Sequence, residues 1–214
     1  MNKMVACAML LPFLFMGLSL AVEGRQVGVA VLPEDYDLYD RVIEGKFLTS
    51  QIHLVLLERM TVSRLVPDQP DSMTMAFFQQ QEFFNGMIPH ELVRDFIGAN
   101  QAQSRLAGRF GFGVRYRFVS GEKDEDVEAH LAVPALNNHR VVLQSPSVLD
   151  RLAFSRVGRT LKNDHALVYV ENRRRDGTGA GFLVWLHRGE QGWNLFDTEV
   201  VWTLRDRADE NASP

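Results

Sequence analysis

The residues of this chain that could do chemistry match none of the common catalytic or metal-binding patterns. A serine nucleophile elbow needs G-x-S-x-G on a turn between a strand and a helix, whereas Ser155 lacks both glycines and lies in a predicted strand. A catalytic triad can also be assembled from distant residues, so only the local pattern is missing. His90 and Glu91 begin like the H-E-x-x-H helix of zinc proteases, but Arg94 stands where the second histidine belongs. We therefore expect no cofactor, and the balance favours a protein that is not an enzyme.

Besides His90, the chain has five histidines, and their spacing is not typical of metal ligands: His53, His130, His139, His165 and His187.

Three consecutive arginines are candidates for binding an anion: Arg173, Arg174 and Arg175 precede the glycine-rich run 177–181. Arginines beside flexible glycines can bind a phosphate or an acidic surface. However, phosphate loops place their glycines between a strand and a helix, whereas an apolar strand follows here. The competing interpretation is a basic hairpin tip that discourages pairing between sheets.

Four polar residues are candidates for lining a pocket, and they are His53, Asp95, Asn100 and Glu199. A pocket protein needs an enclosed apolar cavity with converging polar groups, whereas an interaction module needs an exposed apolar or charged patch. Packing in the core explains Trp185, Trp193 and Trp202. If the sheet curves into a cone, as in the NTF2-like fold, the same tryptophans line a pocket.

Helical periodicity in the first half indicates the elements that must position these side chains. Tyr36, Tyr39, Ile43 and Phe47 share one helical face, which predicts an amphipathic helix beginning near Pro33. A second helix is predicted over 73–84, and a third begins at Pro89 with a stripe of Leu92, Val93, Phe96 and Ile97.

Strand patterns dominate the rest of the chain. Residues 52–57 are almost wholly apolar, and residues 110–118 alternate apolar with polar or glycine. Four further strands are predicted at 152–157, 166–171, 182–188 and 193–204, with a break in the last near Asp197. Their short connections predict an antiparallel meander. The fold class is therefore α+β, with N-terminal helices packed on one face of a mostly antiparallel sheet.

The N-terminus predicts export from the cytoplasm. One cation, Lys3, precedes a run from Val5 to Leu20 without any charge, and Ser19-Leu20-Ala21 supplies a cleavage site. We expect a signal peptide over 1–21, a single domain over 22–204 and a disordered tail over 205–214. Uncleaved, the segment could just span a membrane, and only then do we expect a membrane partner.

Cysteine content and charge limit the mature chain. Cys7 is the only cysteine and lies in the predicted signal, so the mature chain has no disulfide, thiolate nucleophile or cysteine-bound metal. Loss of Lys3 lowers Lys plus Arg from 23 to 22 against 27 Asp plus Glu. This acidic balance argues against a nucleic-acid partner.

A C-terminal pattern resembles a known group of proteins. It comprises Phe154 to Gly158, then Ala166 to Val170, then Gly179-Ala180-Gly181, and finally Gly192-Trp193 before Val201-Trp202. It resembles a group of uncharacterised bacterial exported proteins and lipoproteins. The resemblance supports the fold and the compartment, periplasmic or secreted, and implies no chemistry.

The expected function is that of a non-catalytic binding module of the cell envelope whose partner is a protein or an envelope component. The alternative is a pocket protein of NTF2-like architecture, either a small-ligand carrier or an enzyme.

Overall fold

The structure is a computed structural model that describes residues 30–120, 123–124, 147–174 and 177–204. The elements, in chain order, are α1 (Asp35–Val42), a π-helical turn (Ile43–Phe47), β1 (Ile52–Glu58), a 3-10 turn (Pro70–Ser72), α2 (Met75–Gln81), a second 3-10 turn (Phe83–Gly86), α3 (His90–Ala99), β2 (Arg115–Ser120), β3 (Lys123–Asp124), β4 (Ser147–Phe154), β5 (Gly158–Arg159), β6 (His165–Arg173), β7 (Gly179–Gly189) and β8 (Gly192–Leu204). The predicted signal peptide, the predicted C-terminal tail and Arg175 lie outside the described residues.

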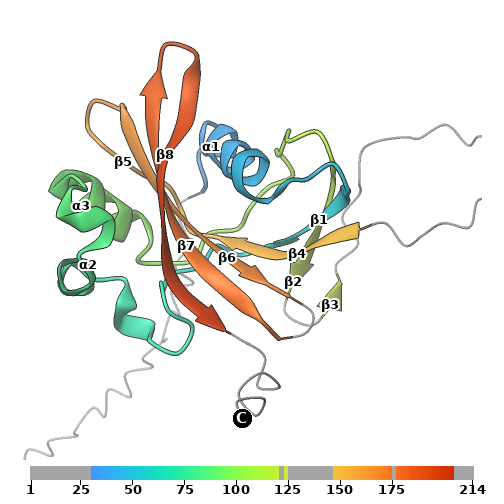
Figure 1. Ribbon diagram of the computed structural model, residues 1–214, viewed down its shortest axis with the longest axis horizontal. Coiled ribbons are helices and arrows are strands. Elements are labelled where there is room, and N and C mark those ends of the chain that lie inside the picture. Colours follow the sequence, from blue (N-terminus) through green and yellow to red (C-terminus); the bar gives the residue numbers. More distant parts are fainter. Residues whose placement is uncertain (1–29, 121–122, 125–146, 175–176, 205–214) are drawn as a thin grey trace, which may run out of the picture.

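An open mixed sheet forms the centre of the fold (Figure 1). Seven strands follow the order β3-β2-β1-β4-β6-β7-β8, and the short β5 pairs with β6 beside this path. Strands β6, β7 and β8 form the predicted antiparallel meander. Strand β1 lies parallel to both of its neighbours, β2 and β4, so the sheet is mixed. The α+β class predicted from the sequence is confirmed.

Helices cover both faces of the sheet, not one face as the sequence suggested. Figure 1 shows α1 on one side of the β7–β8 hairpin and α2 and α3 on the other. The reason lies in β6, where Ala166, Val168 and Val170 pack in one core while Leu167 and Tyr169 pack in the other. Because consecutive side chains of a strand point to opposite faces, a continuous apolar run needs cover on both.

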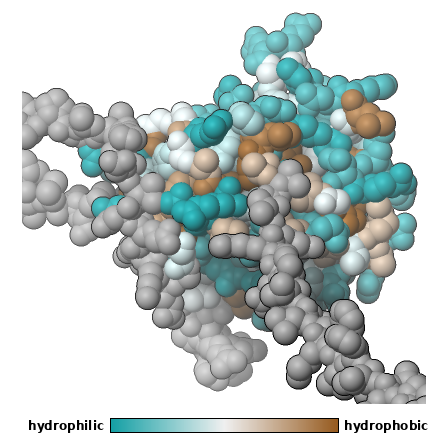
Figure 2. All heavy atoms as spheres, turned by 180° about the vertical axis from the view of Figure 1, so that it is seen from behind, coloured by the Kyte–Doolittle hydropathy of each residue, from teal (hydrophilic) through white to brown (hydrophobic). Residues whose placement is uncertain are grey.

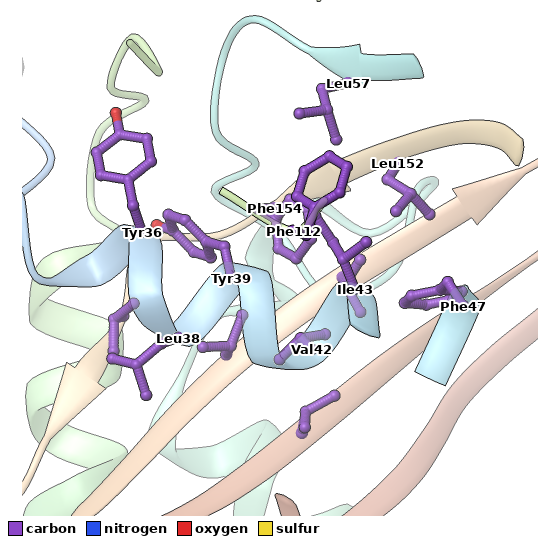
Figure 3. Close-up of a cluster of buried hydrophobic side chains, with 14 of the residues drawn as sticks. Tyr36, Leu38, Tyr39, Val42, Ile43, Phe47, Leu57, Phe112, Leu152 and Phe154 are labelled. Atoms are coloured by element: carbon purple, nitrogen blue, oxygen red, sulfur yellow. The ribbon is translucent and has the colours of Figure 1, made fainter. Parts of the chain in front are cut away.

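The first core is built around α1 (Figure 3). Tyr36, Tyr39, Ile43 and Phe47 are all buried, as their shared helical face predicted. The π-helical turn continues this face beyond Val42, so the apolar stripe is longer than α1 itself. This face stacks on Phe154, whose ring centroid lies 4.9 Å from that of Tyr39.

Two predicted strands begin or end elsewhere. The strand expected over 110–118 begins only at Arg115, and Phe110 and Phe112 precede it as part of an aromatic cluster. Gly113 adopts a φ of +80°, a left-handed conformation that interrupts an extended strand at this point. The strand expected over 152–157 ends at Phe154.

The break predicted near Asp197 is a β-bulge. Trp185 pairs with Asp197 and Leu186 pairs with Leu195, so Phe196 is an extra residue in β8. The bulge shifts the alternation of β8 and leaves Phe196 60 % exposed, stacked on Trp185 at 4.8 Å between ring centroids.

The visible surface shows no single apolar face. Seen from behind, hydrophobic residues form separate patches among hydrophilic ones (Figure 2). Within the described part of the chain, no helix combines the length and the apolarity that crossing a membrane requires.

Candidate functional site

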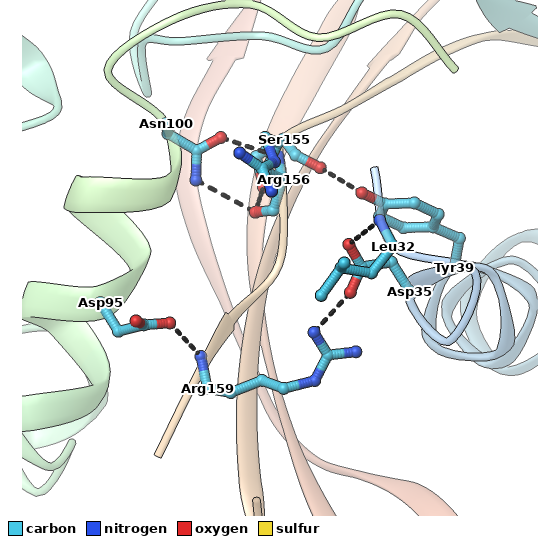
Figure 4. Close-up of polar contacts among 8 residues, drawn as sticks. All are labelled: Leu32, Asp35, Tyr39, Asp95, Asn100, Ser155, Arg156 and Arg159. Atoms are coloured by element: carbon cyan, nitrogen blue, oxygen red, sulfur yellow. Dashed lines mark hydrogen bonds and ion pairs between the residues drawn. The ribbon is translucent and has the colours of Figure 1, made fainter. Parts of the chain in front are cut away.

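The segment that follows β4 joins the two helical layers, and the candidate site is built on it (Figure 4). Asn100, at the end of α3, accepts a hydrogen bond from the Arg156 N–H at 2.7 Å and donates one to the Arg156 carbonyl at 3.0 Å. From the opposite layer, the Tyr39 hydroxyl donates to the Ser155 carbonyl at 2.9 Å. The main chain of the segment is therefore held by side chains from both helical layers.

Arg159 completes this junction. Its N–H donates to the Asp95 carboxylate of α3 at 2.7 Å, and its guanidinium forms an ion pair with Asp35 at the start of α1. Burial raises the pKa of Asp35 above its usual value, while the charge and hydrogen bond of Arg159 lower it again. Arg159 thus links α1 to α3 and also contributes to the walls of two grooves, one on each side of it.

The first of these, which we call the polar groove, is a cavity of about 530 Å³ between α1 and the tips of two hairpins. Its main lining residues are Glu34, Asp37, Asp40, Glu44, Arg188 and Trp193. The acidic residues come from α1, from the residue before it and from the π-helical turn after it. On the opposite wall, the Arg188 guanidinium lies 5.8 Å from the centre of the Trp193 ring. The polar groove therefore has an acidic wall facing a cationic and aromatic one.

Asp40 is the chemically distinctive residue of the polar groove. Its Oδ2 accepts a hydrogen bond from the Gly111 N–H at 2.8 Å, while its Oδ1 is buried and has no hydrogen-bond partner among the described residues. Burial, aided by the nearby Glu44 and Asp37, raises the pKa of Asp40 to about 6. A carboxyl group with such a pKa can exchange a proton near neutral pH.

The second, which we call the apolar groove, is a cavity of about 570 Å³ on the α3 side of Arg159. Its main lining residues are Leu32, Arg94, Asp95, Arg156, Val157 and Leu161. Leu161 stands at the tip of the turn between β5 and β6 and is 95 % exposed. This groove therefore combines exposed apolar side chains with charged ones.

The turn that carries Leu161 is stabilised by hydrogen bonds between its own residues. The Thr160 hydroxyl lies 2.5 Å from an Asp164 carboxylate oxygen, and this hydrogen bond lowers the pKa of Asp164. Asn163 adopts the left-handed conformation that the turn needs, with a φ of 54°. Leu161 is therefore held outward by a defined turn.

The four residues proposed from sequence as pocket candidates do not share one cavity in this arrangement. Asp95 lines the apolar groove, and Asn100 is buried beside it with its amide bonded to the chain. Glu199 accepts a hydrogen bond from the Phe84 N–H at 3.0 Å, and His53 is exposed on β1. Three of the four thus hold main-chain groups in place.

The arginine cluster is partly committed to the fold. Arg173 donates to the Glu171 carboxylate through two nitrogens, each at 2.9 Å, and the Glu171 side chain is 2 % exposed. The Arg174 N–H bonds the Thr178 carbonyl at 2.9 Å. The charge of Arg173 therefore neutralises a buried carboxylate.

The pairing of β6 with β7 brings together two histidines that the sequence keeps apart. His165 pairs with His187, their ring centroids lie 5.0 Å apart, and the Trp185 indole donates to Nδ1 of His165 at 3.1 Å. Among the described residues, no group of three or more His, Cys, Asp or Glu side chains is placed to hold a metal ion.

Of the groove residues named above, sequence reasoning proposed only Asp95 as a pocket residue, and it predicted neither groove as a whole. The acidic face of α1 and the π-helical turn had a signal in the sequence, because Asp37, Asp40 and Glu44 are three and four residues apart. No such signal exists for Leu161, because the exposure of a single leucine in a polar turn cannot be read from the residue types around it.

The fold and this junction define an α+β protein with two adjoining surface grooves. A scan against protein-family models and searches of curated proteins and of solved structures find no match to this chain.

Proposed function

We propose that this protein is an exported, non-catalytic binding module of the cell envelope that docks a partner, either a protein or an envelope component, at the apolar groove. The observation that carries the docking step is Leu161, which is 95 % exposed on a turn fixed by Thr160. Burying a leucine side chain contributes about 1.5–3 kcal/mol, so a partner that covers Leu161 gains appreciable binding energy.

The bonding of the junction supports a binding role. Asn100, Asp95 and Ser155 all bond main-chain groups, which makes the wall of the apolar groove rigid. A rigid surface loses less conformational entropy when a partner binds.

The proposed export is supported by the uncharged run from Val5 to Leu20 and the cleavage site after Ala21. The resemblance to bacterial exported proteins and lipoproteins points to the same compartment. Fractionation of cells that make the protein tests this proposal. We expect a mature form that begins at Val22 in the periplasm or the medium, and a full-length form in the cytoplasm would contradict it.

Docking is tested by chemical cross-linking in the envelope fraction, followed by isolation of the tagged protein. We expect a discrete adduct with the wild type and its loss with Leu161→Ser. The matched control is Met87→Ser, which removes another exposed apolar side chain, 64 % exposed, outside the groove lining. An adduct that survives Leu161→Ser would contradict docking at this site.

The second candidate function is a pocket protein of NTF2-like architecture, either a small-ligand carrier or an enzyme. Asp40 favours this second function, because it lines a cavity of about 530 Å³ and its pKa is raised to about 6. Its Oδ1 is buried and has no hydrogen-bond partner among the described residues. A thermal-shift screen of small cationic and zwitterionic compounds tests it. Stabilisation by a compound that Asp40→Asn abolishes would favour this function over the first.

A further inference from the structure

We propose that the polar groove binds a small zwitterion, a ligand that carries an ammonium group and a carboxylate at opposite ends of a short chain. The inference rests on the second candidate function above and adds the chemistry of its ligand. The ammonium group would lie against the acidic wall, and the carboxylate would bind the Arg188 guanidinium on the opposite wall. The methylene groups between them would contact the Trp193 ring.

The acidic wall keeps its negative charge when every charged group on it is counted. These groups are four acids and one base: Glu34, Asp37, Asp40, Glu44 and Arg41. The ion pair between Arg41 and Glu44, 3.4 Å from Nη1 to Oε2, cancels one of each. Three carboxylates remain, or two when Asp40 holds its proton, so the wall attracts an ammonium group.

The opposite wall offers one guanidinium to an anion. Its cations are Arg159 of β5 and Arg188 of β7. The ion pair with Asp35 neutralises Arg159, whereas the Arg188 side chain has no hydrogen bond or ion pair among the described residues. Asp164 accepts the Arg188 N–H through its carbonyl, but its carboxylate bonds the Thr160 hydroxyl. The Arg188 guanidinium is therefore available for two-point binding of a carboxylate.

The charges of the two walls together select a ligand with both signs of charge. The seven charged lining residues are four acids and three bases, and Asp35 adds a fifth acid beside Arg159. The whole groove is therefore negative and disfavours a simple anion. A simple cation would leave Arg188 without a partner. A zwitterion satisfies both walls, because each of its charges faces the opposite charge.

The size of the polar groove suits a small molecule. Its volume of about 530 Å³ lies within the range of about 300–1,000 Å³ that is typical of ligand sites. Trp193 is half-buried in the wall beside Arg188 and offers an apolar surface between the two charged ends. Free amino acids and short peptides both carry the two charges, and they differ in the distance between them.

Isothermal titration calorimetry with ω-amino acids of increasing chain length tests the inference. Each is compared with the alkylamine and the carboxylate of the same length, which carry only one of the two charges. At one chain length, we expect the zwitterion to bind about tenfold or more tightly than either control, because it makes both charge contacts. Raised ionic strength should reduce this advantage.

A second series of glycine peptides with matched lengths separates the two sources of the ligand. Tighter binding of a peptide would identify a short peptide as the ligand, and tighter binding of an ω-amino acid would identify a single amino acid. Either result supports a zwitterion site, provided that the single-charge controls bind more weakly.

Matched variants locate the two contacts. Arg188→Gln should abolish the advantage of the zwitterion over the amine, and Asp37→Asn should reduce its advantage over the carboxylate. Both side chains are exposed and make no hydrogen bond or ion pair among the described residues, so we expect both variants to fold. Arg115→Gln and Asp71→Asn, at exposed residues outside the groove lining, should leave both advantages unchanged.

An amine or a carboxylate that binds as tightly as the zwitterion at every length would overturn the inference and leave the pocket function standing. Zwitterion binding that Arg188→Gln leaves unchanged would do the same. Absence of binding in both series and in the thermal-shift screen would overturn the inference together with the pocket function. Docking at the apolar groove is tested separately, by the adduct that depends on Leu161.

Discussion

The side-chain amide of Asn100 bonds both main-chain polar atoms of Arg156, at 2.7 Å to its nitrogen and 3.0 Å to its carbonyl oxygen. The geometry reproduces the two bonds that a neighbouring strand would make, at a place where β4 has ended. A third bond, from Nδ2 to the Phe96 carbonyl at 2.8 Å, ties the same amide to α3. Asn100 therefore fixes the wall of the apolar groove relative to the helix.

The first prediction concerns this amide. Asn100→Ala should lower the free energy of unfolding by about 2–3 kcal/mol, because the partly buried Arg156 N–H loses its partner and the other two bonds of the amide are lost. Urea unfolding followed by circular dichroism measures the change. The control is Gln101→Ala, at an exposed neighbour, which should stay within about 0.5 kcal/mol of wild type. A loss no larger than that of the control would show that Asn100 does not hold the junction.

The second prediction concerns the close packing of β5 on α3. A Cβ at Gly158 would lie 2.5 Å from the Phe96 Cα, so Gly158→Ala should cost about 3 kcal/mol or more. A Cβ at Gly98, in α3, would meet no described atom within 4 Å, so Gly98→Ala should be neutral or stabilise by about 0.5 kcal/mol. Thermal unfolding of both variants tests this prediction, and we expect a lower melting temperature for Gly158→Ala than for Gly98→Ala. Similar melting temperatures for the two variants would contradict the close packing of β5 on α3.

The third prediction concerns the arginine cluster. Arg173→Ala should destabilise the protein by about 2 kcal/mol at neutral pH, because it leaves the buried Glu171 carboxylate without its cation. Adding Glu171→Gln to Arg173→Ala should restore part of the loss. Lys162→Ala, which removes an exposed cation elsewhere, is the control for net charge. An Arg173→Ala variant that is as stable as Lys162→Ala would contradict the prediction. Any test of anion binding that replaces Arg173 must therefore also measure the stability of the variant.

The fourth prediction concerns Asp40 and pH. The pKa of Asp40 is raised from 3.8 to about 6 in the folded state, so the folded state binds the proton more tightly than the unfolded state. The stabilising contribution of this proton is fully present below about pH 4 and is lost as pH rises through about 6. Asp40→Asn, which mimics the protonated form, should gain stability relative to wild type across this window.

Urea unfolding of the Asp40→Asn and wild-type proteins between acid and neutral pH measures the effect. Asp71→Asn, at an exposed carboxylate, is the control. A stability difference between Asp40→Asn and wild type that does not change with pH would contradict the raised pKa.

The sequence predicted most of the helices and strands because their signals are local. The apolar face of α1 and the runs in β6 and β7 identify themselves by periodicity. The loss of phase near Asp197 likewise marked a true bulge. The parallel pairing of β1 with β2 and β4 had no such signal, because it joins segments far apart in the chain.

The candidate site was harder to predict for the same reason. Asp95 and Asn100 were predicted to line a pocket, but their partners Arg159 and Arg156 lie more than fifty residues away in the sequence. The exposure of Leu161 is set by the β5–β6 turn and its neighbours, so composition does not reveal it. Tertiary contacts, and not local propensity, create both grooves.

Site-specific photo-cross-linking in cells tests the central claim, docking at the apolar groove, most directly. A photoreactive phenylalanine analogue placed at position 161 should give a discrete adduct with one envelope partner, and the same analogue at position 87 should not. Adducts at both positions with the same yield, or none at position 161, would contradict the account.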